Sequence, residues 1–130
     1  MGRILAANRN WDVRFNADKS PEIYLNGVWS PICGHDFWNN DNGATAFCEK
    51  LGFTSGTSSG PIGVYSQDAV EVGICHRGDN LNECDSGGAR GKLSDRCKAR
   101  ERVKLAITCS NNTSKCFLRD PYDIPDDTVD

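Results

Sequence analysis

Cysteine is the residue type in this chain with the widest choice of chemistry, and the sequence contains seven. A thiol can bind a metal, act as a nucleophile or form a disulfide. No two cysteines are separated by only two residues, and His35 and His76 lack the spacing of a zinc-binding pair, so the pattern argues against a zinc knuckle. We therefore expect disulfides, which persist in secreted and extracellular proteins. Overlapping glycosylation sequons at Asn111 and Asn112 fit secretion.

A basic segment in the C-terminal third of the chain has the charge to bind an anionic polymer. Between residues 90 and 104, seven basic side chains stand against two acidic ones, a net charge of +5. Five of the cations recur at every second position, which in a strand places them on one face: Arg96, Lys98, Arg100, Arg102 and Lys104. A linear polyanion suits this arrangement. The alternative interpretation is an ordinary solvated strand face, on which cations at this spacing repel one another.

Enzymatic machinery is not evident in the sequence. It has no nucleophile elbow with Ser, His and Asp, and no phosphate-binding glycine motif after a strand. No carboxylate lies in an apolar context that would raise its pKa for acid catalysis. We therefore predict a protein that is not an enzyme and requires no cofactor. No run of about 18 apolar residues is present, so we expect no membrane span in this chain.

The elements that must position these residues follow from local patterns. Two strand-prone runs flank Asn26-Gly27, a pair that favours a tight hairpin, and Pro31 belongs at an edge because it cannot donate to a ladder. Apolar residues at helical spacing over 44–51, followed by Gly52, predict one amphipathic helix that carries Cys48 on its apolar face. Alternation predicts a final strand over 103–109. We also expect a strand over 70–75 and long loops over 54–63 and between residues 84 and 97.

Several of these segments resemble one known family. Residues 22–33 read Glu-Ile-Tyr-Leu-Asn-Gly-Val-Trp-Ser-Pro-Ile-Cys, which resembles the opening of a scavenger receptor cysteine-rich (SRCR) domain, a Val-Glu-Val-like strand and Gly-x-Trp-Gly-Thr-Val-Cys. Residues 36–38 are similar to the family's Asp-x-Trp, 44–53 to its Ala-x-x-x-Cys-x-x-Leu-Gly-Phe helix, and 60–62 to its Gly-Pro-Ile. Residues 75–84 are similar to its Cys-x-Gly-x-Glu-x-x-Leu-x-x-Cys, one residue shorter. The resemblance covers about 20–110, which leaves a lead-in over 1–19, with at most one early strand, and an acidic tail over 111–130.

The resemblance carries expectations about fold and pairing. It implies an α+β fold: a small, disulfide-stapled domain in which a curved antiparallel sheet cradles one α-helix, with long loops. The six-cysteine form of the family implies the disulfides Cys33–Cys97, Cys48–Cys109 and Cys75–Cys84. Family members bind polyanions, microbial surfaces or partner proteins, through basic clusters and through a cation site built from acidic side chains.

The family's cation site is only partly represented here. Its Asp-Asp pair becomes His35-Asp36, Glu71 falls where a loop Asp is expected, and Asp79 replaces a Glu. Glu101 stands for a late acid only if a two-residue extension of the final strand is absorbed. Calcium prefers six to eight oxygen ligands, so two interpretations stay open: a calcium site formed by these acids, or solvated acids at loop tips. Residues 77–79 spell Arg-Gly-Asp, which integrins recognise; we attribute it to chance, because the family pattern already accounts for Gly78 and Asp79.

Our leading functional hypothesis is a secreted binding module for an anionic polysaccharide, another anionic surface polymer or a partner protein, with no nucleic acid as its physiological target. The alternative is a structural subunit of an extracellular matrix or filament, linked through Cys116 and the tail. Cys116 is the odd cysteine, either an unpaired thiol or an intermolecular link that allows self-association. The stretch after it carries a net charge of −4 and could shield the basic segment.

Overall fold

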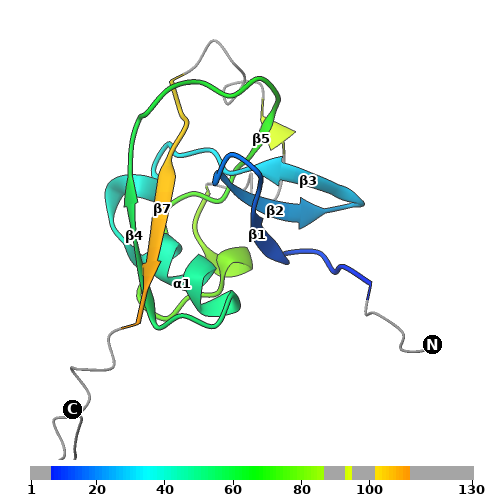
Figure 1. The fold of residues 1–130 in the computed structure, drawn as a ribbon. Coiled ribbons are helices and arrows are strands. Elements are labelled where there is room, and N and C mark those ends of the chain that lie inside the picture. Colours follow the sequence, from blue (N-terminus) through cyan, green and yellow to red (C-terminus); the bar gives the residue numbers. More distant parts are fainter. Residues whose placement is uncertain (1–6, 87–92, 95–101, 112–130) are drawn as a thin grey trace, which may run out of the picture.

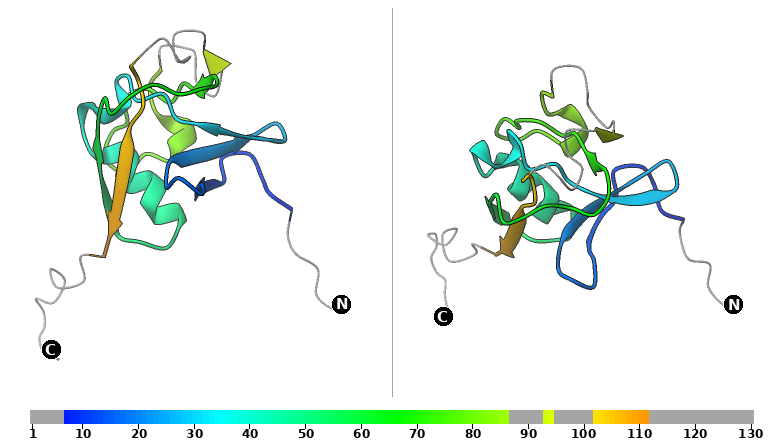
Figure 2. Two further views of the ribbon diagram at one scale, coloured as in Figure 1. Left: turned by 45° about the horizontal axis from the view of Figure 1, so that its top comes forward. Right: turned by 90° about the horizontal axis from the view of Figure 1, so that it is seen from above.

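The part of the chain that the structure describes contains one α-helix and three small antiparallel sheets (Figure 1). The computed structural model describes residues 7–86, 93–94 and 102–111. Sheet one has the order β1-β2-β3, and the other two pair β4 with β7 and β5 with β6. Figure 2 shows that the β4-β7 pair and the three-stranded sheet lie on different sides of the helix α1. Among the described residues, no helix is long and apolar enough to cross a membrane.

The predicted hairpin is confirmed as β2 (Pro21–Leu25) and β3 (Val28–Pro31). Asn26 and Gly27 have φ values of 52° and 86°, so both central residues of the turn take the positive φ that a type I′ turn requires. The lead-in contains the early strand allowed for it, β1 (Val13–Phe15), which pairs with β2. Consequently β3 is an edge strand of its sheet and ends at Pro31, as its missing N–H requires.

The predicted helix is confirmed as α1 (Asn42–Lys50). It follows the 3-10 helix η1 (Phe37–Asn39). The helix ends as Gly52 adopts a φ of 95° and donates its N–H to the Glu49 carbonyl at 3.0 Å, while Phe53 donates to the Cys48 carbonyl at 3.0 Å. These two bonds form a Schellman motif, which needs the left-handed conformation that glycine adopts without steric cost.

The loop predicted over 54–63 is wrong, because β4 (Ser55–Ser59) occupies most of it and pairs with β7 (Ala106–Ser110). Its glycine and serine content indicated a loop, but the strand passes so close to the helix that it needs small residues. A Cβ at Gly56 would collide with the Cys48 Sγ and the Ala44 backbone. Glycine in a strand often marks such a close approach.

The strand predicted over 70–75 is mostly wrong. Only β5 (Ala69–Val70) is a strand, and it pairs with β6 (Leu93–Ser94), which lies inside the stretch expected to be a loop. Gly73 interrupts the extended chain with a φ of 84°, at a place where a Cβ would collide with the Asp85 backbone. Beyond it, Ile74 and Asp85 exchange two backbone hydrogen bonds of 2.9 Å, and the 3-10 helix η2 (Leu81–Glu83) follows within the same loop.

The final strand is shorter than predicted, since β7 starts at Ala106 and not at 103. The register that pairs Ser59 with Ala106 would place Pro61 opposite Lys104. Pro61 has no N–H to donate, and instead Ile62 donates to the Lys104 carbonyl while Lys104 donates to the Gly63 carbonyl. Two residues thus face one, as in a β-bulge, and the regular ladder stops at Ala106.

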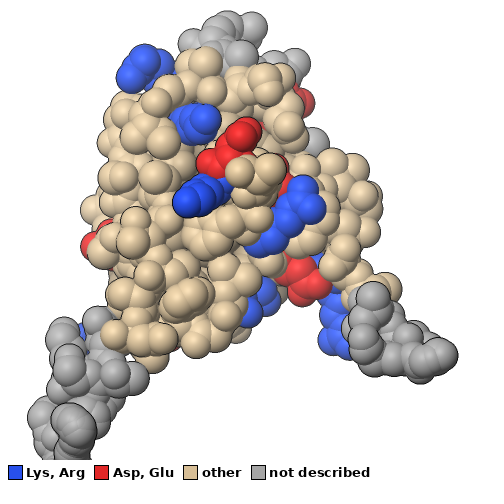
Figure 3. Space-filling view, viewed as in Figure 1, with Lys and Arg blue, Asp and Glu red and all other residues tan. Residues whose placement is uncertain are grey.

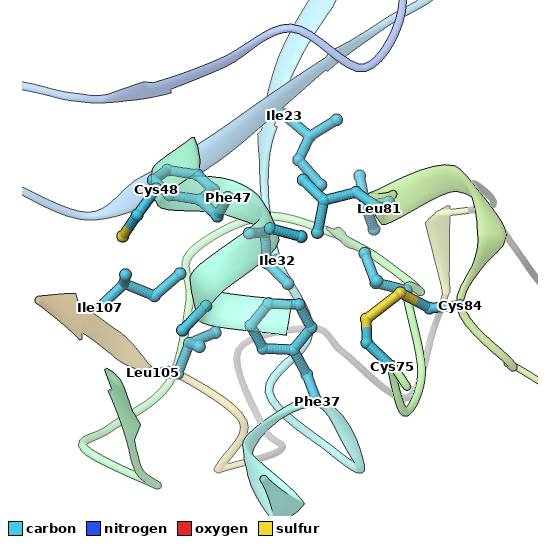
Figure 4. Close-up of a cluster of buried hydrophobic side chains, with 14 residues drawn as sticks. Ile23, Ile32, Phe37, Phe47, Cys48, Cys75, Leu81, Cys84, Leu105 and Ile107 are labelled. Atoms are coloured by element: carbon cyan, nitrogen blue, oxygen red, sulfur yellow. A yellow bond between two sulfur atoms is a disulfide. The ribbon is translucent and has the colours of Figure 1, made fainter. Parts of the chain in front are cut away.

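A buried cluster joins the sheets to the helix (Figure 4). Phe37, Phe47, Ile23 and Ile32 are fully buried. Two predicted disulfides are confirmed within the described residues: Cys48–Cys109, which ties α1 to β7, and Cys75–Cys84, which closes the loop around η2. Cys33 is also disulfide-bonded, and its predicted partner Cys97 lies outside the described residues.

Candidate binding surface

The described end of the basic segment keeps the alternation expected from the sequence, although it is not a regular strand. Val103 and Leu105 are buried, Arg102 is exposed and Lys104 is half-buried. Alternate side chains therefore point to the core and away from it. Arg96, Lys98 and Arg100 lie outside the described residues, so their shared face stays a prediction.

Backbone and side-chain hydrogen bonds fix the position of Lys104. Its N–H donates to the Gly63 carbonyl at 3.0 Å, and its carbonyl accepts from Ile62 at 2.8 Å. Next to it, the Tyr65 hydroxyl accepts from the Leu105 N–H at 3.3 Å and donates to the Ile32 carbonyl at 2.7 Å. Burial raises the pKa of Tyr65 to about 12, so the hydroxyl keeps its proton and donates at neutral pH.

Arg102 and Lys104 form no ion pair with a carboxylate in the part of the chain that the structure describes. Arg14 is different, because its guanidinium lies 2.7 Å from Glu22 and stacks 4.4 Å from the centre of the Trp29 ring. Figure 3 shows basic side chains near the end of the molecule where the chain enters β7.

The acids proposed for a calcium site lie as follows. Asp36 is exposed, with one carboxylate oxygen 3.5 Å from His35 Nδ1. Glu71 is buried at 6% exposure. Asp79 accepts from the His76 backbone N–H at 2.9 Å. Within the described ranges no three His, Cys, Asp or Glu side chains are grouped closely enough to hold a metal, and Glu101 lies outside those ranges; a calcium site therefore remains a prediction.

The remaining predicted site residues are the Arg-Gly-Asp tripeptide, the two sequon asparagines and Cys116. Within the Arg-Gly-Asp tripeptide, Asp79 turns its carboxylate back to His76, so the acid already has a backbone partner. Asn111 is exposed at the end of the described chain. Asn112 and Cys116 lie beyond it.

Sequence patterns did not reveal the residues that hold Lys104. Gly63 and Tyr65 belong to a stretch with no periodic signal, and they meet Lys104 and Leu105 across about 40 positions of sequence. The Gly-Pro-Ile segment before Gly63 was the only local clue, since a proline beside glycine marks an irregular chain path.

Comparisons with known proteins address the fold. No family model matches the sequence, and no curated protein matches it either. Among solved structures, the chain is similar to the SRCR domain of mouse MARCO, crystallised in a dimeric form. The TM-score is 0.54 at 24% sequence identity, and the match covers 83% of this chain and 93% of that one. With the helix α1, its antiparallel sheets and its disulfides, the chain has the α+β fold of a scavenger receptor cysteine-rich domain.

Proposed function

We propose that this chain is an extracellular binding module that recognises anionic ligands through the basic segment that ends at Arg102 and Lys104. The observation that carries the proposal is the outward placement of two cations that have no carboxylate partner among the described residues. Cations without a carboxylate partner attract an anion, and the backbone hydrogen bonds of Lys104 hold one of the two in place before binding.

Two further observations support an extracellular role. The disulfides Cys48–Cys109 and Cys75–Cys84 are of the kind that persists in oxidising compartments. The SRCR fold is shared with a domain of mouse MARCO, and fold alone leaves the ligand to be argued from the surface. The sequence favours an anionic polymer, because the basic residues recur at every second position over residues 96–104.

Charge reversal tests the proposal. The double variant Arg102→Glu with Lys104→Glu should weaken binding to immobilised heparin by about tenfold or more, since opposite charges in contact become like charges. The matched control is Arg9→Glu with Arg77→Glu, which makes the same change in net charge at two exposed positions elsewhere. Surface plasmon resonance gives the affinities, and circular dichroism verifies that both variants are folded. Equal losses in the two variants would show that only net charge matters, and the basic segment would not be the site.

A further inference from the structure

A hollow of about 230 Å³ opens beside Lys104, between the turn that joins β1 to β2 and the segment over residues 64–67. It is smaller than the ~300–1,000 Å³ of pockets that hold drug-sized ligands. A single ring or side chain therefore fits better than a larger group. Acidic and basic side chains lie close together near the centre of the face in Figure 3.

Hydrogen bonds make both walls of this hollow rigid. In the turn, the Asn16 side-chain oxygen accepts from the N–H groups of Asp18 at 2.8 Å and Ser20 at 3.0 Å. On the other side, Tyr65 is anchored to Ile32 and Leu105, and the Lys104 backbone is bonded to residues 62 and 63. The shape of the hollow is thus set before a ligand arrives, which lowers the entropic cost of binding.

The polar side chains around the hollow divide into occupied and free groups. Glu22 is occupied, since it accepts from Arg14 at 2.8 Å and from Asn16 at 3.0 Å. Five other lining side chains have no side-chain hydrogen bond or ion pair within the described chain: Asp18, Ser20, Ser66, Gln67 and Lys104. Val64, which is 43% exposed, adds an apolar surface to the rim.

This combination matches the chemistry of an acidic sugar. Lys104 can pair with a carboxylate or sulfate, while Asp18, Ser66 and Gln67 offer acceptors and donors for ring hydroxyls. Val64 can cover the apolar face of the ring. A polymer made only of anionic groups would pair with Lys104 but would be repelled by Asp18.

We infer that the hollow binds one sugar ring of an acidic polysaccharide, so the anionic ligand of this module is a glycan and not any polymer of the same charge. This inference rests on the proposed function and names its ligand class. Asp18 then strengthens the binding of an anionic polysaccharide despite its own negative charge, because its carboxylate accepts hydrogen bonds from hydroxyl groups of the sugar.

The variant Asp18→Ala tests the inference with two probes, heparin and inorganic polyphosphate. Removal of one negative charge should raise the affinity for polyphosphate. The affinity for heparin should fall by about tenfold, as expected for the loss of hydrogen bonds to a charged group. A rise in the affinity for polyphosphate together with a fall in the affinity for heparin would exclude a purely electrostatic effect. Asp41 and Asp12 lie outside the hollow, but each accepts a backbone hydrogen bond. The matched control is therefore Glu49→Ala, an exposed acid in α1 that does not line the hollow and has no side-chain bond within the described residues.

A second variant, Ser66→Trp, fills the hollow without changing charge. It should weaken heparin binding and leave polyphosphate binding unchanged, while Thr57→Trp, at an exposed position in β4, should alter neither. If Asp18→Ala raised both affinities alike, or Ser66→Trp left heparin binding intact, the sugar site would be refuted while the basic segment still stood as an anion site. A wild-type protein that bound neither polymer would overturn the proposed function itself.

Discussion

Tyr65 links the core to the basic segment through a single hydroxyl. It is only 6% exposed and spans two segments, as a donor to Ile32 and an acceptor from Leu105. Because the phenolate form would be desolvated there, burial raises the pKa of Tyr65 from 10.0 to about 12. The hydroxyl therefore contributes to folding only while it holds its proton.

The variant Tyr65→Phe should lower the free energy of unfolding by about 1–3 kcal/mol at neutral pH, since Ile32 and Leu105 lose a buried partner. The pKa in the folded state exceeds the unfolded value, so this stabilisation is complete below pH 10 and is lost as the pH rises toward 12. Urea unfolding at neutral pH and above pH 11 should show a gap between the two proteins that shrinks in alkali. A gap of constant size would contradict this account, because it would show that ionisation of Tyr65 does not change the free energy of unfolding.

At the scale of elements, β4 shows how the helix closes a sheet edge. Gly56 and Ser58 direct their N–H groups away from β7, and side chains near the start of α1 accept both: the Thr45 hydroxyl at 3.2 Å and the Asp41 carboxylate at 2.9 Å. The Thr45 hydroxyl also donates to the Gly56 carbonyl at 3.2 Å. An edge satisfied in this way is protected from pairing with another chain.

Removal of the Thr45 hydroxyl should show how much it contributes to the free energy of unfolding. Thr45→Val keeps the shape but leaves the buried Gly56 amide and carbonyl without that partner, at a cost of about 1–3 kcal/mol of unfolding free energy. Thr45→Ser retains the hydroxyl and should cost less. Chemical denaturation of the two variants in parallel compares them. If the Thr45→Val protein were as stable as the Thr45→Ser protein, water would have replaced the hydroxyl, and β4 would not need the hydrogen bonds to Thr45.

Local signals predicted the local elements well. The hairpin around Asn26-Gly27 and the end of α1 at Gly52 depend on the backbone freedom of two neighbouring residues, which sequence displays directly. The strand β4 was missed because its glycine and serine residues are required by the close packing of helix α1. Its pairing partner, β7, lies about 50 residues away in the sequence. β7 was predicted too long because the residue that stops its ladder, Pro61, lies in that partner's segment.

The candidate site divides in the same way. The alternation of Arg102 and Lys104 with buried neighbours follows from period-two patterning and was visible in the sequence. The hollow was not visible, since Asp18 and Gln67 come from turns that the fold brings together from about 50 positions apart. No local sequence pattern indicates that these two distant segments come into contact.

For the whole molecule, disulfides compensate for a small core. The bridge between Cys48 and Cys109 joins residues 61 apart in sequence, and in the chain-entropy model a loop of that length contributes about 4 kcal/mol. Such a scaffold can leave its surface charges unpaired, because ion pairs at the surface add little to stability. Polar and charged surface residues are then free to serve binding.

Heparin affinity measured over a range of salt concentrations, with and without a calcium chelator, tests the central claim most directly. If the basic segment contacts the ligand, affinity should fall steeply with salt, with just under one unit of log–log slope for each cation contact, as for proteins on nucleic-acid phosphates. The charge-reversed Arg102→Glu with Lys104→Glu protein should show a flatter slope, and the chelator should change little. The account would be contradicted if chelation abolished binding while the charge-reversed protein still bound, because recognition would then depend on Asp36, Glu71 and Asp79.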